Sequence, residues 1–263
     1  MPNVLGQVSS WNLYHYTDIN ALINIVNDNG IVLWATNCSY LNDPKELQEG
    51  INAVKRIEGV SIHPGSLRNY YLTSFSSNSD SLNMWGMYAA NGLGCAIGFD
   101  YDMLWKGYGI MIQCSYGEAE VDTRLKGSLN LARNGCMAHI SPEGNMSIPK
   151  FDDKTDRENR EALVNNSIIC ACLGAKNEAY RSEAETRGIV YVNEGKYVKF
   201  RSRKGYIVPY VQIILPKDAL KEIIVGPTTD SELTMKSILQ MLSLKGYDID
   251  NIKISKSKIP YRG

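Results

Sequence analysis

Short apolar runs, rich in β-branched residues and bounded by turn residues, dominate this sequence, and longer segments with helical periodicity are fewer. The strand-like runs are 12–16, 31–35, 70–75, 94–99, 110–116, 206–215, 222–225 and 251–255, with another beginning at the Glu-x-Glu near residue 185. Because strands outnumber helices and do not alternate regularly with them, the pattern predicts an α+β fold with a mixed, largely antiparallel, split sheet and flanking helices.

Helix boundaries are indicated by capping residues. Thr17 is expected to cap a helix that Gly30 ends, and residues 78–90 form a second expected helix. Capping boxes at 155–158 and 229–232 predict helices that reach about 173 and 244. We expect one domain over 1–263, with the Gly-, Asn- and Ser-rich stretch 126–153 as a candidate insertion or mobile loop.

Composition excludes several classes of protein. The formal net charge is zero, which argues against a protein that mainly coats nucleic acid. No apolar stretch approaches the about 20 residues of a membrane span, and the N-terminus does not resemble a secretion signal. The six cysteines form no CxxC pair and the three histidines lie at no ligand spacing to them. We expect a cytoplasmic protein with reduced thiols, no metal and no membrane partner.

Positive charge is concentrated in residues 196–204, KYVKFRSRK, where aromatic residues alternate with lysine and arginine. Such a run can bind phosphates and stack on bases. It is more often a solvated loop or an edge strand protected by lysines. Both interpretations stay open from the sequence.

An acidic pair begins the strand-like run near residue 185. Residues i and i+2 of a strand share a face, so we expect Glu183 and Glu185 to point the same way, with Arg187 next to them. Like charges this close are costly unless something compensates them, which favours a functional site. The structural alternative is a solvated strand edge on which the arginine bridges two carboxylates.

Three further segments carry polar or aromatic side chains that could bind a ligand. A strand ends at His15 and Tyr16, and Thr17 follows where the next helix begins. Ser74 and Ser76 lie at the end of another strand, and Trp85 and Tyr88 share one helical face. Each has an ordinary structural alternative: a structural histidine, helix-capping hydroxyls and core aromatics. The turn signal at 42–44 supplies one more acid, Asp43.

In this order, the motifs Leu-Tyr-His-Tyr-Thr, Asn-Asp-Pro, Ser-Phe-Ser, Met-Trp-x-x-Tyr and Glu-x-Glu-x-Arg resemble a widespread bacterial domain-of-unknown-function family. The endings at 223–227 and 257–262 are also similar to that family, so the resemblance covers nearly the whole chain. It implies no mechanism.

A more distant resemblance does imply one. His15-x-Thr17, Ser74-Phe75-Ser76 and Glu183-x-Glu185 are similar to the ADP-ribosyltransferases, including the type that modifies DNA. The resemblance implies an ADP-ribosyltransferase-like fold with NAD as substrate, Glu185 stabilising charge on the ribose and Glu183 orienting or deprotonating the acceptor. It further implies contacts to NAD from His15, Tyr16, Thr17, Ser74, Ser76, Trp85, Tyr88 and Arg187. In this interpretation Ser74 and Ser76 orient Glu185 by hydrogen bonds, and Arg187 or Arg181 binds the pyrophosphate or holds the two glutamates in place. The histidine belongs to one branch of these enzymes and the Glu-x-Glu to another.

These observations predict an NAD-dependent ADP-ribosyltransferase or NAD glycohydrolase, of the kind found among bacterial toxins and phage-defence effectors. The acceptor, protein or nucleic acid, is left open, as is the oligomeric state. One alternative is a non-catalytic nucleotide-binding sensor module. Another is a metal-dependent nuclease that uses Asp43, Glu183 and Glu185.

Overall fold

The computed structural model describes residues 12–41, 46–134, 139–140, 146–147, 153–203, 205–227 and 230–260. The chain folds into two compact units, each built from separate stretches of sequence. Unit 1 comprises Met1–Thr36, Tyr71–Met111 and Ser182–Gly263, and unit 2 comprises Asn37–Tyr70 and Ile112–Arg181. The expectation of a single domain over 1–263 stays a prediction.

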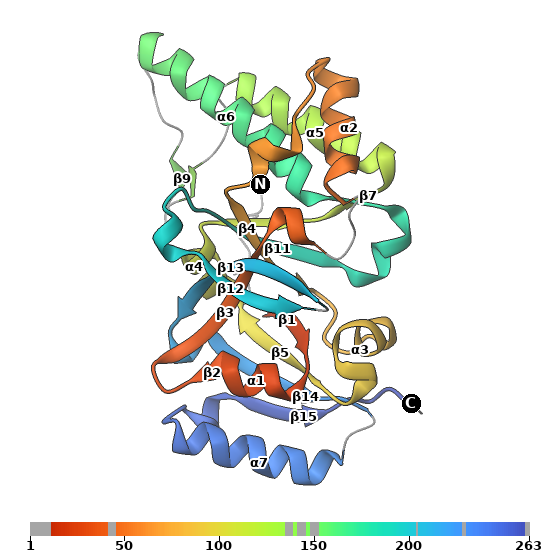
Figure 1. The fold of residues 1–263 in the computed structure, drawn as a ribbon, viewed down its shortest axis with the longest axis vertical. Coiled ribbons are helices and arrows are strands. Elements are labelled where there is room, and N and C mark those ends of the chain that lie inside the picture. The colour runs from red at the N-terminus through yellow and green to blue at the C-terminus, as the bar shows by residue number, and fades with distance from the viewer. Residues whose placement is uncertain are drawn as a thin grey trace, which may run out of the picture. The chain divides into compact units, whose positions relative to one another are not determined.

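The fold is α+β, with a mixed, mostly antiparallel sheet of 11 strands (Figure 1). Its main path runs β12 (Lys199–Arg203), β13 (Tyr206–Leu215), β3 (Gly30–Asn37), β4 (Tyr70–Ser76), β1 (Asn12–Thr17), β5 (Cys95–Asp100), β14 (Leu220–Val225) and β15 (Lys253–Lys256). Off this path, β11 (Glu185–Tyr191) pairs with β4 and β6 (Ile110–Gln113), and β2 (Val26–Asn27) pairs with β3. The pair β14–β15 is parallel.

Helices of unit 1 flank this sheet. They are α1 (Ile19–Ile25), α3 (Leu82–Tyr88), α4 (Tyr101–Tyr108) and α7 (Ser231–Leu244), with 3₁₀ turns η3 (Ala90–Gly92), η5 (Gly195–Tyr197), η6 (Lys217–Ala219) and η7 (Ile249–Asn251). Strand residues alternate between the two faces of the sheet, and one set builds the main core, in which Leu13, Leu33, Phe75, Phe99 and Ile223 are buried together. A smaller core under α3 contains Tyr16 and Trp85.

Unit 2 is mainly helical. Its helices α2 (Glu46–Glu58), α5 (Gly117–Arg133) and α6 (Asp153–Gly174) pack against one another. Gly50 lets α2 approach α6 closely, because a Cβ there would meet the backbone of Ala171 and Cys172 at 2.4 Å. The unit also holds the parallel pair β7 (Ser115–Tyr116) and β10 (Ala175–Lys176), the pair β8 (His139–Ile140) and β9 (Met146–Ser147), and 3₁₀ turns η1 (Cys38–Tyr40) and η2 (Pro64–Leu67).

The expected strands are all present, within a few residues at their ends, and the run 110–116 is divided into β6 and β7. The helix predictions need correction. The first helix is capped by Asp18, whose carboxylate accepts a hydrogen bond from the Ala21 amide, and not by Thr17. The helix expected over 78–90 is the shorter α3. Residues 126–133 belong to α5 instead of a loop, and most of the remainder of 126–153 lies outside the described residues.

Helices α2, α4 and most of α5 were not predicted from the sequence. Among the residues that the structure describes, no helix is both long and apolar enough to cross a membrane.

Candidate functional site

The predicted site residues of unit 1 gather around the end of β4. Strand β1 lies between β4 and β5 in the sheet, and Tyr14 of β1 is opposite Ser76 of β4. Next to this pair, His15 Nδ1 lies 2.9 Å from the carbonyl oxygen of Ser74. A carbonyl oxygen only accepts hydrogen bonds, so the contact assigns the proton of a neutral imidazole to Nδ1 and leaves Nε2 as an acceptor. The histidine therefore joins β1 to β4 through a side chain.

Burial acts on this imidazole. His15 is partly buried, and desolvation lowers its pKa below the usual value, with a smaller contribution in the same direction from the positive charge of Arg201. The hydrogen bond to Ser74 opposes the shift. His15 is consequently neutral at pH 7 and can accept a hydrogen bond from a ligand hydroxyl at Nε2.

The two glutamates lie at a corner of the chain, and not on one strand as expected. Glu183 is the last residue of the 3₁₀ turn η4 (Glu178–Glu183), whereas Glu185 is the first residue of β11. Between them Ala184 has a φ of 44°. This left-handed conformation costs a residue with a Cβ about 1–2 kcal/mol, so the surrounding contacts must hold the corner in place.

Ser76 holds this corner against β4. Its hydroxyl donates to the backbone carbonyl of Glu183 at 2.6 Å, and the Ser77 amide donates to the carbonyl of Ala184 at 3.0 Å. The prediction that Ser74 and Ser76 orient the Glu185 carboxylate is therefore wrong for Ser76, which holds the backbone of the preceding corner instead. The Ser74 side chain is exposed.

Helix α3 supplies the partner of the first glutamate. Tyr88 donates a 2.7 Å hydrogen bond from its hydroxyl to Glu183 Oε1, and Asn83 donates through its amide to the Ser182 hydroxyl at 3.1 Å. The Glu183 residue is only 4% exposed. The sequence predicted Tyr88 as an aromatic contact to NAD, whereas the contact observed in the structure is to the carboxylate of Glu183.

The second glutamate is paired with arginine. Arg187 Nε lies 2.9 Å from Glu185 Oε1 and Arg187 Nη2 lies 3.1 Å from Oε2, which is a bidentate pair between residues i and i+2 of β11. Glu185 is 3% exposed and Arg187 1% exposed. These two side chains share a face, as expected, but the solvated strand edge of the structural alternative is wrong because both are buried.

The other predicted aromatic residues belong to the core. Tyr16 donates its hydroxyl to the Asn78 carbonyl at 2.9 Å, and its ring meets Trp85 edge-on with centroids 4.9 Å apart. Trp85 is fully buried and donates from Nε1 to Asp80 at 2.6 Å. Burial raises the pKa of Tyr16. Neither ring presents a face to a ligand in this structure, and Thr17 is buried too, so we leave these three residues out of the proposed site.

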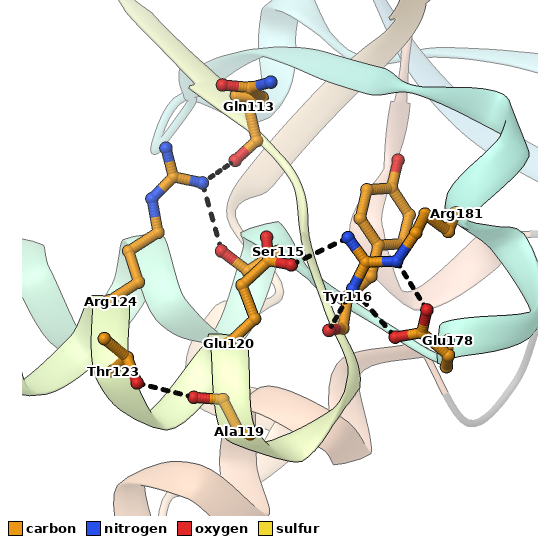
Figure 2. Close-up of polar contacts among 9 residues, drawn as sticks. All are labelled: Gln113, Ser115, Tyr116, Ala119, Glu120, Thr123, Arg124, Glu178 and Arg181. Carbon is orange, nitrogen blue, oxygen red and sulfur yellow. Dashed lines mark hydrogen bonds and ion pairs between the residues drawn. The ribbon is translucent and has the colours of Figure 1, made fainter.

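Arg181 lies in unit 2, where it belongs to a separate cluster (Figure 2). Its guanidinium pairs with Glu178 and, at 2.9 Å, with Glu120, and it donates to the Tyr116 carbonyl at 3.1 Å. Arg124 of the same cluster donates to the Gln113 carbonyl and to the Ser115 hydroxyl. Two carboxylates already pair with Arg181, so we leave it out of the proposed site.

The described structure does not test the nuclease alternative. Asp43 lies outside the described residues. Within the described part of the chain, no three His, Cys, Asp or Glu side chains are grouped so that they could hold a metal ion. The five cysteines placed by the structure are free thiols.

The basic run 196–204 forms η5 and the edge strand β12. Lys196 pairs with Glu194 at 2.5 Å, whereas Arg201 lies in a different environment: its guanidinium carbon is 5.3 Å from the Trp34 ring centroid. Lys204 is outside the described residues.

Comparison with protein-family models, with curated proteins and with solved structures finds no match to this chain.

Two features of the site were missed from the sequence. The strained corner at Ala184 has no sequence signal. A positive φ is predicted where glycine or asparagine occurs, whereas alanine is a common helix residue. It was also missed that no carboxylate of the described residues pairs with Arg201. The alternation of Lys199, Arg201 and Arg203 is a strand pattern that could have placed these three cations on one face.

Proposed function

We propose that this protein cleaves the N-glycosidic bond of NAD and transfers ADP-ribose to an acceptor or to water. The single observation that carries the proposal is the Glu183–Glu185 corner, which is strained at Ala184 and tied by Ser76 to β4, the strand that His15 also contacts. One strand thus links the imidazole and the acidic pair. The motif resemblance to ADP-ribosyltransferases supports the same function.

Glu185 is the group proposed to stabilise the reaction. Cleavage of the glycosidic bond develops positive charge on the ribose, and a carboxylate of fixed orientation lowers the energy of that charge. The bidentate contact with Arg187 provides such fixed orientation. Arg187 accordingly acts as a positioning residue for Glu185, and Ser76 positions the backbone of the corner.

Glu183 and His15 are proposed to handle hydroxyl groups. Glu183, held by Tyr88, is the candidate base that takes the proton of the attacking acceptor or water as nicotinamide leaves with the bonding electrons. His15 would accept a hydrogen bond from a ribose hydroxyl at Nε2. The same roles serve whether water or a macromolecule accepts the ADP-ribose.

A second candidate function is a sensor that binds NAD or another nucleotide without cleaving it. The burial of Glu185 and Arg187, both below 4% exposure, favours this alternative, because a catalytic carboxylate must reach the ribose. The two functions share the site and differ in turnover.

The test is to incubate the purified full chain with NAD at pH 7.5 and to measure the released nicotinamide by chromatography. We expect turnover, and a fall of about 10²–10³-fold in rate for Glu185→Gln. Because this variant leaves Arg187 without the carboxylate of Glu185, Glu183→Gln is measured beside it, which changes the carboxylate that Tyr88 donates to and keeps the Glu185–Arg187 pair. A slower rate in both variants supports the proposal.

Glu46→Gln is the matched control. Glu46 pairs with Lys176 at 3.3 Å, both are buried, and both belong to unit 2, so this variant breaks a similar ion pair elsewhere. It should lose stability and keep NAD cleavage. Wild-type activity in Glu185→Gln would contradict our assignment, and a thermal shift with NAD but no released nicotinamide would support the sensor.

A further inference from the structure

Strands β3, β13 and β12 carry cations and aromatic rings but no acidic residue. In the register, Lys199 is opposite Tyr210 and Arg203 is opposite Tyr206, while Tyr210 is opposite Thr36 on the other side. Directly opposed residues of antiparallel strands share a face. One face of these strands, here named the basic–aromatic face, therefore presents Trp34, Thr36, Lys199, Arg201, Arg203, Tyr206 and Tyr210.

Arg201 is the centre of this face. Its guanidinium carbon lies 5.3 Å from the Trp34 ring centroid and 5.7 Å from that of Tyr210, and the two rings are 4.5 Å apart. Nη2 donates to the Thr36 hydroxyl at 2.8 Å. The Nε atom is buried without a hydrogen-bond partner. Within the described chain no carboxylate pairs with this arginine, unlike Arg181 and Arg187.

A half-buried cation without a counter-ion is a costly arrangement. Desolvation lowers the pKa of Arg201, and the neighbouring charge of Arg203 acts in the same direction. The aromatic rings compensate part of this cost and at the same time fix the orientation of the guanidinium. An anion from solution would supply the missing counter-charge and hydrogen-bond acceptor.

We propose that the basic–aromatic face binds single-stranded nucleic acid, with Arg201 contacting a backbone phosphate. Lys199, Arg201 and Arg203 alternate along β12, so their Cα atoms follow one another at about 6.6–6.8 Å along one face of the strand, a spacing close to that of successive phosphates on an extended single strand. A row of cations matches the repeated phosphates of a nucleic-acid backbone better than it matches one small anion.

Exposed rings beside the cations favour a single strand over a duplex. Tyr206 is 71% exposed and lies opposite Arg203, and Phe200 on the other side of β12 is 67% exposed. Stacking of bases on aromatic rings is sequence-tolerant and needs base faces that a duplex hides. Arg201 would bind a phosphate of such a strand, and Tyr206 would stack on one of its bases. Two independent features of this face therefore fit the same ligand.

The test is fluorescence anisotropy of labelled 12-nucleotide dT and U oligomers with the full chain, between 50 and 300 mM NaCl and without NAD. Binding measured in this way is independent of the proposed glycosyl transfer. We expect Arg201→Met to weaken binding about 10-fold or more at 100 mM NaCl, and to reduce the slope of log K against log[salt] by about 0.7, the value for one phosphate on a single strand.

Two further variants separate binding from folding. Tyr206→Ser, at an exposed position, should weaken binding and leave the salt slope unchanged, because it removes stacking and no charge. Lys236→Met removes an exposed cation of α7, away from this face, and should leave affinity and slope as in the wild type. Arg201→Met should unfold at the same temperature as the wild type or higher, because it removes a desolvated charge.

The proposal is overturned if the wild type fails to bind either oligomer, or if Arg201→Met and Tyr206→Ser both bind as the wild type does. Equal affinity for a duplex of the same length, or binding to vesicles with 30% phosphatidylserine but to no oligomer, would also overturn it. A wild-type salt slope in Arg201→Met would show that this residue contacts no phosphate.

Discussion

Two arginines six residues apart have opposite environments. Arg187 of unit 1 is 1% exposed and makes a bidentate pair with Glu185, whereas the Arg181 side chain of unit 2 is 51% exposed and pairs with Glu178 and Glu120. In water the second arrangement is screened and each side chain also loses rotational freedom. The difference shows that an ion pair is held in a fixed arrangement, as a functional site requires, only when it is buried away from water. It also explains why the proposed site includes one arginine and not the other.

The largest effect should follow from removing Arg187. In Arg187→Met the Glu185 carboxylate loses its bidentate partner inside the protein, and we expect a loss of about 3–5 kcal/mol in the free energy of unfolding. Urea titration followed by circular dichroism measures this loss. A change below about 1 kcal/mol would mean that the pair is more solvated than its burial indicates.

The second buried pair, in unit 2, sharpens the comparison. Lys176 and Glu46 are 3.3 Å apart and both buried, but lysine makes no bidentate contact. Lys176→Met should therefore destabilise the protein by about 2–4 kcal/mol, somewhat less than Arg187→Met, in the same titration. If Lys176→Met leaves the free energy of unfolding unchanged while Arg187→Met lowers it strongly, then the location of the pair in the fold, and not its burial, decides the effect.

The partly buried imidazole should make stability depend on pH. Because the folded-state pKa of His15 is lowered, the unfolded chain binds more protons between that pKa and about 6.5. The free energy of unfolding should therefore decrease as pH falls below about 6.5. Urea titrations at pH 5.0 and 7.5 measure the difference, and His15→Gln should reduce it. An unchanged pH dependence in that variant would assign the effect to other groups.

The smallest effect should come from the exposed cluster. Arg181→Met should leave stability unchanged within the error of a urea titration, and any residual loss should vanish in 1 M NaCl. The NAD-cleaving activity should be that of the wild type, because this arginine is outside the proposed site. A large loss of activity would break the distinction between the two arginines.

The sequence predicted the secondary structure of unit 1 better than that of unit 2. Strands such as β5 and β13 are short, β-branched and buried, so composition alone marks them. The helix α5 was missed because its apolar positions are sparse among polar and glycine residues, and only packing against α2 and α6 stabilises it. The capping error at Thr17 shows that two adjacent polar residues can compete for one helix end.

Several predicted site residues lie near one another in the structure, but not in the orientation that the sequence predicted. The sequence brought out Glu183, Glu185, Arg187, Ser76 and Tyr88, and the structure does bring these side chains or their backbone together. It could not show that the chain turns at Ala184, since a positive φ at alanine is imposed by the contacts of the corner. The sequence left Trp85 open between a core and a ligand-binding role because both kinds of aromatic residue share the same helical spacing, and the structure buries it fully.

By itself the sequence determined the class of fold, α+β, and the alternation that places Glu185 beside Arg187 on one strand, because period and composition are local properties. Only the tertiary structure decided which charges are desolvated. Burial depends on which elements cover a side chain, and those elements come from distant parts of the chain, as Tyr88 does for Glu183 and Trp34 for Arg201. For this protein that distinction separates a buried acidic corner, and an arginine that no carboxylate of the described chain pairs with, from ordinary surface ion pairs.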